Sequence, residues 1–446
     1  MKSLHSISLV ALVLVSELAR AASPAIDTLA IAGSVTDTVH AAADPTQTYA
    51  LFLPSRYETS RRWPLLVLMD PRGHALVPLK LFQAAAERYG YIVMSSYQTR
   101  SDGPVEPNDR AVNAILADAQ TRYSVDTRRF YFAGFSGTGR LAWYYAYSIP
   151  QSAAGLIEVG AGLPDPGLLL RERVSADTTA HFAVFLSVGS TDFNYEEVVS
   201  LNAKLKLFGV RNHLEIFNGP HSWPPESVCL NAITWMQLQA MRDGRLALDR
   251  RWVDSLFSAA VRRADELVTI DRYSAFIAYQ QIDHEFAGIH DIAGVRLASD
   301  RLFRSDAVKL TIDRLTALSV AEQNFHQQET SFFADFAKTQ LGTERLRQLL
   351  ELDGLRDRAT QAKDTLVAAA AARLLASVFV RSSFYEPRRH LALGDTLTAL
   401  RMYAFAQSIH PEDQDLCAER NRLFQAYGAR KSVPPELECE YSPPTR

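Results

Sequence analysis

Short apolar runs alternate with amphipathic segments along the first half of the chain. The apolar runs are rich in β-branched and aromatic residues and predict buried strands, a first one at 48–53, a weaker one at 156–159 and the clearest at 64–69, 91–95, 129–133 and 182–188. Helical spacing of apolar residues predicts helices at 77–89, 108–123, 140–148 and 195–208. Strands that alternate with helices of this length predict an α/β fold with a doubly wound, mainly parallel sheet.

The second half of the chain differs from the first in its distribution of proline. No proline occurs between Pro225 and Pro387, and this stretch is rich in Ala, Leu and Arg. Because proline breaks helix interiors, such a composition favours helices. Apolar residues recur there at helical spacing, for example at Trp252, Leu256 and Phe257. We therefore expect three parts, a leader at 1–21, an α/β domain at 22–244 and an all-α domain at 245–446.

The extreme N-terminus is typical of a secretory signal peptide. Lys2 precedes an apolar run at 7–15, and the segment ends in Ala19-Arg20-Ala21. The run falls well short of the ~20 apolar residues that cross a bilayer, so we expect export and no membrane anchor. The predicted localisation is secreted or periplasmic.

Charge and cysteine content narrow the range of partners and cofactors. The chain carries 47 Lys and Arg against 50 Asp and Glu, a net charge of −3, so nucleic acid is not an expected partner. The three cysteines lack metal-ligand spacing, and we expect no metal and no other cofactor. In an exported protein Cys417 and Cys439 are able to form a disulfide, and the alternative is that both are free thiols like Cys229.

Candidate chemistry begins where the strand at 129–133 ends. The chain continues as Gly134-Phe135-Ser136-Gly137-Thr138-Gly139 and passes at once into the helix from residue 140. A serine in such a sharp strand-to-helix turn projects its hydroxyl above the sheet, and small neighbours let strand and helix approach each other. The helix N-terminus offers free N–H groups to a developing oxyanion. Ser136 is therefore the candidate nucleophile.

This context resembles the α/β-hydrolase superfamily, and within it the secreted esterases of the feruloyl esterase and polyester depolymerase type. In those esterases Tyr-x-Val-Asp-x-x-Arg leads into the elbow strand, as Tyr123-Ser124-Val125-Asp126-Thr127-Arg128-Arg129 does here. The family elbow is Gly-x-Ser-x-Gly, whereas this chain has Thr138 at the second glycine position and a glycine one residue later. Threonine is small enough to be accommodated, and we expect it to narrow the site.

A serine hydroxyl needs an adjacent base, and the resemblance implies the chain order serine, acid, histidine. His221 lies in Asn218-Gly219-Pro220-His221-Ser222-Trp223-Pro224, which is similar to the family's catalytic histidine loop. Its place in this loop and its position after the serine and the acid in the chain favour His221 as the base. The alternative is a loop histidine without a catalytic role.

The predicted acid is Asp192, which follows the strand at 182–188. The ends of parallel strands meet at one sheet edge, so Asp192 and Ser136 are expected at the same edge. Aspartate also suits a turn or a helix cap, and Asp165 and Glu158 are then the substitutes.

The oxyanion hole is expected to use two backbone N–H groups. One comes from Gly137, the residue after the nucleophile, and the other from the loop after the strand at 64–69. Pro71 in that loop has no N–H, so Arg72 is the predicted second donor, through its backbone alone.

The loops beside these residues are candidates for binding the substrate. Tyr97 and Arg100 follow another strand end, and Trp223 lies in the histidine loop. The alternative for Tyr97 and Arg100 is a solvated loop without a binding role.

Part of the second half resembles a tetratricopeptide unit. The segment 394–411 is rich in small residues at helical spacing and ends in His410-Pro411. This is one convincing repeat in a helical-repeat-like domain. The domain is equally suited to bind a protein partner, to cap the active-site edge or to support dimerisation.

Together these features predict an exported serine hydrolase that cleaves carboxylic esters through a Ser-His-Asp triad and an acyl-enzyme. The resemblance implies a small-molecule or polymer-derived ester as substrate. Two alternatives remain, a short-peptide or amide hydrolase on the same triad, and a non-catalytic protein that binds a partner through its helical domain.

Overall fold

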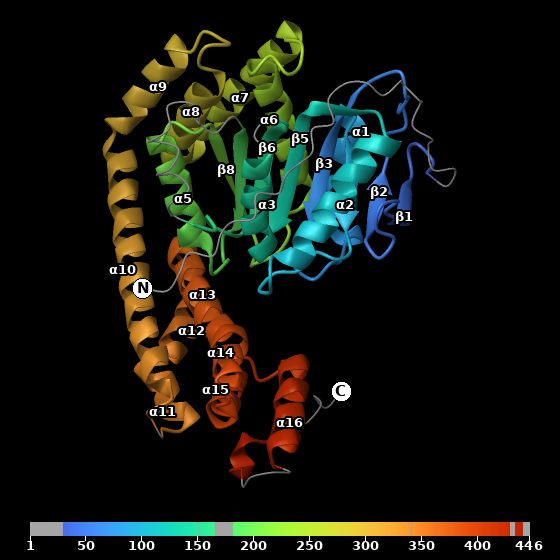
Figure 1. Cartoon of the computed structure of the whole chain (residues 1–446). Helices are drawn as coiled ribbons and strands as arrows, with labels where there is room; N and C mark the ends of the chain where they lie inside the picture. Colours follow the sequence, from blue (N-terminus) through green and yellow to red (C-terminus); the bar gives the residue numbers. More distant parts are fainter. Residues whose placement is uncertain (1–29, 150, 166–181, 340, 429–432, 440–446) are drawn as a thin grey trace, which may run out of the picture. The chain divides into compact units, whose positions relative to one another are not determined.

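The computed structural model describes residues 30–149, 151–165, 182–339, 341–428 and 433–439 (Figure 1). The predicted signal peptide at 1–21 lies outside these residues. The chain forms two compact units. One contains the described residues up to Gly189 with 197–259 and 288–290, and the other contains 190–196, 260–287 and 291 onward. The domain boundary expected between residues 244 and 245 stays a prediction.

The first unit is built on an eight-stranded sheet in the order β1-β2-β4-β3-β5-β6-β7-β8. β1 pairs with β2 and β2 with β4 in antiparallel fashion, and all other neighbours are parallel. This confirms the mainly parallel sheet. The strands are β1 Val35–His40, β2 Thr48–Phe52, β3 Trp63–Met69, β4 Ile92–Ser96, β5 Val125–Phe135, β6 Ala153–Val159, β7 Ala183–Gly189 and β8 Asn212–Phe217.

Helices cover both faces of this sheet, and its central strands are therefore buried on both sides. Every residue of β3 is buried. Successive side chains point to opposite faces, so Tyr131 belongs to the core cluster under α1 and α6, while Phe132 packs on Tyr145 of α3. In Figure 1 α2 and α3 run in front of the strands. The helices of the first half are α1 Leu76–Tyr89, α2 Glu106–Arg122, α3 Gly137–Ser148, α5 Tyr195–Leu207 and α6 Glu226–Arg242.

All elements from Arg250 to Leu437 are helical. The second unit has its own apolar core, in which Phe333 and Phe336 of α10 pack with Phe405 of α15. The tetratricopeptide assignment stays a prediction. The elements are α7 Arg250–Ile270, α8 Arg272–Phe286, α9 Ala293–Phe303, α10 Asp306–Phe336, α11 Thr343–Leu349, α12 Leu352–Gln361, α13 Thr365–Val380, the π-helical η1 Arg381–Tyr385, α14 Glu386–Ala392, α15 Thr396–Ile409, α16 Gln414–Gly428 and the 3-10 helix η2 Pro435–Leu437.

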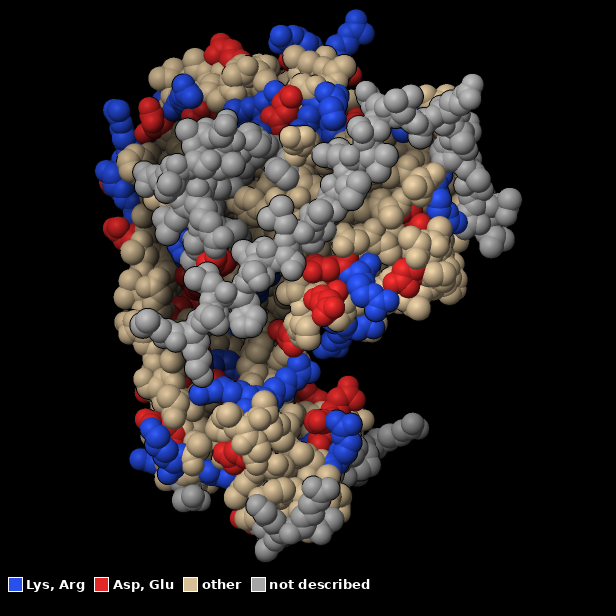
Figure 2. All heavy atoms as spheres, viewed as in Figure 1, with Lys and Arg blue, Asp and Glu red and all other residues tan. Residues whose placement is uncertain are grey.

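One helical stretch among the described residues, Thr365–Ala392, is long and apolar enough to cross a membrane by composition. About two fifths (39%) of its most apolar window is buried within the protein. Arg373, within this stretch, is buried and paired with Glu322. On the face drawn in Figure 2, basic and acidic side chains are interspersed.

A disulfide between Cys417 on α16 and Cys439 fastens the C-terminal segment. The alternative of free thiols at these two positions is therefore wrong. Arg420, also on α16, is buried and donates to the carbonyl oxygens of Leu437 and Glu436, each at 2.7 Å. Cys229 is a free, buried thiol on α6, and burial raises its pKa.

We expect the double variant Cys417→Ser/Cys439→Ser to lower the free energy of unfolding of the helical unit. The two cysteines are separated by 22 positions, and closing a loop of this size stabilises by about 3 kcal/mol. Chemical denaturation of wild type and variant measures the difference. A reductant should lower the stability of the wild type and leave the double variant unchanged, and identical unfolding curves for both proteins would contradict the prediction.

Candidate active site

The turn that carries Ser136 has the strained geometry expected of a nucleophile elbow. Ser136 lies between the end of β5 and the start of α3 with φ 56° and ψ −130°. Residues other than glycine rarely adopt such a positive φ. Gly134 is required beneath it, because a Cβ there would lie 2.2 Å from the carbonyl oxygen of Thr138. The Ser136 N–H donates to the Val159 carbonyl oxygen at 2.8 Å, which ties the elbow to β6.

Thr138, the departure from the family's glycine, has a structural role below the elbow. Its side chain is fully buried. Its hydroxyl oxygen lies 2.6 Å from the carbonyl oxygen of Met69 and 2.8 Å from that of Phe135, and it accepts from the Phe135 N–H at 3.2 Å. The hydroxyl thus joins the end of β3 to the elbow. The expectation that Thr138 narrows the site has no support in these contacts, because the side chain points into the core.

The N-terminus of α3 presents a backbone donor beside the nucleophile. Within the part of the chain that the structure describes, the Gly137 N–H has no acceptor, as is usual for the first N–H groups of a helix. A Cβ on Gly137 would lie 2.5 Å from the Cβ of Ser101. The loop after β4 therefore covers this backbone closely, and only glycine leaves room for it.

The second predicted oxyanion donor, Arg72, is organised by a buried carboxylate. Oδ1 of Asp70 accepts from the N–H groups of Arg72 at 2.8 Å and His74 at 3.0 Å, and Asp70 is only 4% exposed. An oxyanion bound here would share the Arg72 N–H with Oδ1 of Asp70 in a three-centre hydrogen bond. The role of Arg72 stays a prediction, and Asp70 is the residue that the sequence analysis missed.

An aromatic contact with Phe135 places the His221 ring beside the elbow. Its ring centroid is 4.5 Å from that of Phe135, the residue before Ser136. Phe135 also contacts Trp223, with centroids 5.7 Å apart. The Trp223 indole N–H donates to Oδ2 of Asp70 at 2.9 Å. Asp70 therefore joins the loop after β3 to the histidine loop. The indole nitrogen of Trp223 is engaged in this hydrogen bond.

Asp192 is fully buried in the turn that follows β7. Its Oδ1 accepts from the Asn194 N–H at 2.8 Å, and its carbonyl oxygen accepts from the Tyr195 N–H at 3.0 Å. Gly189 at the end of β7 adjoins the histidine loop, since a Cβ there would lie 2.3 Å from the Gly219 carbonyl oxygen. The pairing of Asp192 with His221 stays a prediction.

The two alternative acids are placed differently. Asp165 follows β6 in a loop, next to residues that the structure does not describe. Glu158 is fully buried on β6, where its Oε2 accepts from the Trp143 indole N–H at 2.6 Å. Burial raises the pKa of Glu158 well above its ordinary value, and the Trp143 N–H and Arg140 oppose this shift less strongly. Burial therefore favours the neutral form of this carboxyl, which is less suited than a carboxylate to stabilise an imidazolium.

The loop after β4 places Arg100 against the predicted oxyanion loop. Nη1 of Arg100 donates to the carbonyl oxygens of Tyr97 at 2.7 Å and Thr99 at 2.6 Å. A Cβ on Gly73 would lie 1.7 Å from the same Nη1. The Tyr97 hydroxyl instead bonds to Asp37 on β1, and burial together with Asp37 raises its pKa to about 12. Arg100 thus lies at the site, while the hydroxyl of Tyr97 is engaged elsewhere.

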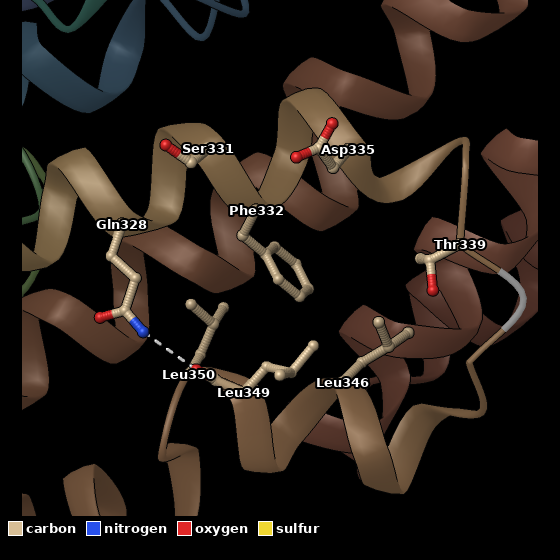
Figure 3. Close-up of a pocket in the computed structure, with 8 residues that line it drawn as sticks. All are labelled: Gln328, Ser331, Phe332, Asp335, Thr339, Leu346, Leu349 and Leu350. Carbon is tan, nitrogen blue, oxygen red and sulfur yellow. Dashed lines mark hydrogen bonds between the residues drawn. The ribbon is translucent and has the colours of Figure 1, made fainter.

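A cavity of about 310 Å³ lies between α10 and α11 of the helical unit (Figure 3). Its floor is apolar, and at one side Gln328 donates to the Leu349 carbonyl oxygen at 3.0 Å. None of the predicted catalytic residues lines it. The lining residues are Gln328, Ser331, Phe332, Asp335, Thr339, Leu346, Leu349 and Leu350.

The link between Asp70 and Trp223 is testable by a double-mutant cycle. In Asp70→Asn one of the three donors loses its acceptor, and Trp223→Phe removes the indole N–H, so each change should lower the free energy of unfolding by about 2 kcal/mol. The double variant should lose no more than the larger single effect, because both changes break one link. Denaturant unfolding of the four proteins measures this, and strictly additive losses would contradict the link.

Glu158 should make the protein less stable as the pH rises. Its pKa in the folded state lies above the ordinary value of 4.5, so the folded protein keeps a proton that the unfolded chain releases, and stability falls from about pH 4.5 up to the folded pKa. Glu158→Gln cannot ionise and still accepts the Trp143 N–H.

The stability of Glu158→Gln relative to wild type should therefore increase from pH 5 up to the folded pKa of Glu158, by up to about 1.4 kcal/mol per pH unit. Unfolding free energies measured across this range give the slope. Glu197→Gln, which removes a half-exposed carboxylate paired with Arg140, is the control without such a slope. Parallel curves for wild type and Glu158→Gln would show that Glu158 is ionised in the folded protein.

No family model and no curated protein matches this chain. Several solved structures are similar to part of it. A ferulic acid esterase is 18% identical, with a TM-score of 0.38 over 46% of this chain and 98% of its own. An S-formylglutathione hydrolase from Staphylococcus aureus is 16% identical, with a TM-score of 0.38 over 47% and 99%. Est1E from Butyrivibrio proteoclasticus is 14% identical, with a TM-score of 0.35 over 43% and 94%. At these identities and TM-scores the matches do not bear on the reaction.

Proposed function

We propose that this protein is a serine hydrolase of the α/β-hydrolase type that cleaves carboxylic esters. The observation that carries the proposal is the strained elbow at Ser136, between β5 and α3. Phe135, the residue before Ser136, contacts the ring of His221. Strained backbone of this kind persists where the surrounding structure over-determines it, and it is concentrated at active sites.

In the proposed reaction Ser136 Oγ attacks the ester carbonyl carbon while His221 takes the hydroxyl proton. Asp192 stabilises the resulting imidazolium, and the Gly137 and Arg72 N–H groups stabilise the oxyanion. The tetrahedral intermediate collapses, and the leaving alkoxide takes the proton from His221. Water then attacks the acyl-enzyme with His221 again as the base, which releases the acid and restores Ser136.

The proposed substrate is a small-molecule or polymer-derived ester met outside the cytoplasm. The disulfide at Cys417 and Cys439 supports an oxidising compartment, in agreement with the secreted or periplasmic location predicted from the N-terminus. Arg72 and Arg100 have exposed side chains beside the proposed oxyanion hole. These two cations favour an ester whose acyl or alcohol part carries negative charge.

Purified wild type should hydrolyse short p-nitrophenyl esters, and Ser136→Ala should lose on the order of 10⁶ in rate. Ser148→Ala, at the far end of the same helix, removes an exposed hydroxyl bonded to the Tyr144 carbonyl oxygen and should keep wild-type activity. Release of p-nitrophenol gives the rates. Labelling by a fluorophosphonate should add one phosphonyl group to wild type and to Ser148→Ala but none to Ser136→Ala.

Equal slow rates in wild type and Ser136→Ala, with no phosphonylation, would rule out the proposed mechanism. The matching p-nitroanilides separate ester from amide hydrolysis. Turnover of the anilides at rates near those of the esters would replace the ester assignment by an amide hydrolase on the same serine.

A further inference from the structure

The segment 190–196, which contains the turn after β7 and the first two residues of α5, belongs by its contacts to the helical unit. Arg373 on α13 donates from Nη1 to the Ser190 carbonyl oxygen at 2.9 Å. The same guanidinium lies over the ring of Tyr195, 4.1 Å from the centroid. Ser319 on α10 donates to Oε2 of Glu196 at 2.8 Å. The helical unit therefore holds this segment at its first residue and at its last two.

Arg373 is itself held in place by a buried carboxylate. Arg373 is 8% exposed and Glu322 on α10 is 2% exposed. Nε of Arg373 donates to Oε2 of Glu322 at 2.9 Å, and Nη2 donates to Oε1. This two-point geometry fixes the plane of the guanidinium. The remaining nitrogen and the flat face are then directed at Ser190 and Tyr195.

We propose that Arg373 is a positioning residue for Asp192, and that the helical unit thereby orients the acid of the triad. This inference rests on the proposed function, in which Asp192 stabilises the His221 imidazolium. Ser190 and Tyr195 flank Asp192 on both sides, and the Tyr195 N–H donates to the Asp192 carbonyl oxygen. Holding both flanking residues fixes the turn that carries the carboxylate.

A second polar cluster on the same two helices provides an internal comparison. Glu329 on α10 accepts from the Ser377 hydroxyl at 3.0 Å and lies 3.9 Å from Arg381. The further partners of Arg381 among the described residues are Glu386, Thr330 and the ring of Phe333, whose centroid lies 4.6 Å from Cζ of Arg381. Arg381 is thus an arginine of the same helical stretch, facing a glutamate of the same partner helix, with no bond to segment 190–196.

The chemistry of arginine explains why this residue type stands at position 373. A buried ion pair alone is often no more stabilising than apolar residues of the same shape. Arginine, however, bonds to a carboxylate with two nitrogens and keeps further donors and a stacking face for other groups. Lysine is unable to make the fork to Glu322, the bond to Ser190 and the stack on Tyr195 at the same time.

The test uses the full-length protein with Arg373→Met/Glu322→Gln, a double change that leaves no unpaired buried charge. Hydrogen exchange of peptides that cover 190–196 reports the order of the segment without any need for activity. We expect the Asn194 and Tyr195 amides to exchange about tenfold faster. For p-nitrophenyl esters kcat should fall about 10²-fold, as for a misplaced catalytic group, with KM nearly unchanged.

Two further variants keep the test decisive. Arg381→Met is the matched control, which should lower the thermal midpoint while leaving both kcat and the exchange of 190–196 at wild-type values. Arg373→Lys keeps the charge and should recover part of kcat and part of the protection. It also provides the same readouts if the double variant does not fold.

Three outcomes separate this inference from the proposed function. Unchanged exchange of 190–196 in a folded Arg373 variant would overturn the inference. Faster exchange in an active enzyme whose kcat is unchanged would also overturn it, because the position of the segment would then not matter for catalysis. Faster exchange in a protein that hydrolyses no ester, even as wild type, would support the positioning by Arg373 and overturn the proposed function.

Discussion

The candidate site depends on the backbone at Ser136, which is held in a left-handed conformation that costs on the order of 1–3 kcal/mol. Several contacts offset this cost. Gly134 leaves room for the turn, the Thr138 hydroxyl joins it to β3, and Val159 accepts the Ser136 N–H. These contacts come from three neighbouring strands, so the elbow is determined by the centre of the sheet and not by the local sequence alone.

The loops at the same sheet edge are organised by buried carboxylates. Asp70 accepts from two backbone N–H groups of its own loop and from the Trp223 indole of the histidine loop. A buried carboxylate with three donors strongly favours one arrangement of both loops, since leaving any of these groups unpaired is costly. Glu158 is the contrasting case, because its one hydrogen bond to Trp143 does not compensate for burial and its pKa is raised.

The helical unit applies the same principle on a larger scale. Its helices α10 and α13 bring together Glu322 with Arg373 and Glu329 with Ser377, all of them buried. Buried polar contacts of this kind specify the register between two helices, which an apolar interface alone defines less strictly. The register in turn decides which backbone groups Arg373 reaches, and these include the Ser190 carbonyl oxygen.

The strands and helices that carry a strong local pattern were predictable from the sequence. β3 and β7 are short, mostly apolar and buried throughout, and the elbow at Ser136 is marked by its glycines. Both signals are visible in the sequence because periodicity and turn chemistry are local properties. β1 was not predicted, since this partly exposed edge strand lacks an apolar run. β8 was likewise not predicted, because its side chains are mostly half-buried and form no continuous apolar run.

By itself, the sequence determined the α/β sheet, the candidate nucleophile and the order of the residues expected to serve it. Only the tertiary structure decided which side chains support those residues. Asp70 and Trp223 are 153 positions apart, and Arg373 and Ser190 are 183 positions apart. Contacts over such separations leave no periodic signal in the chain, because they arise only when distant elements pack together.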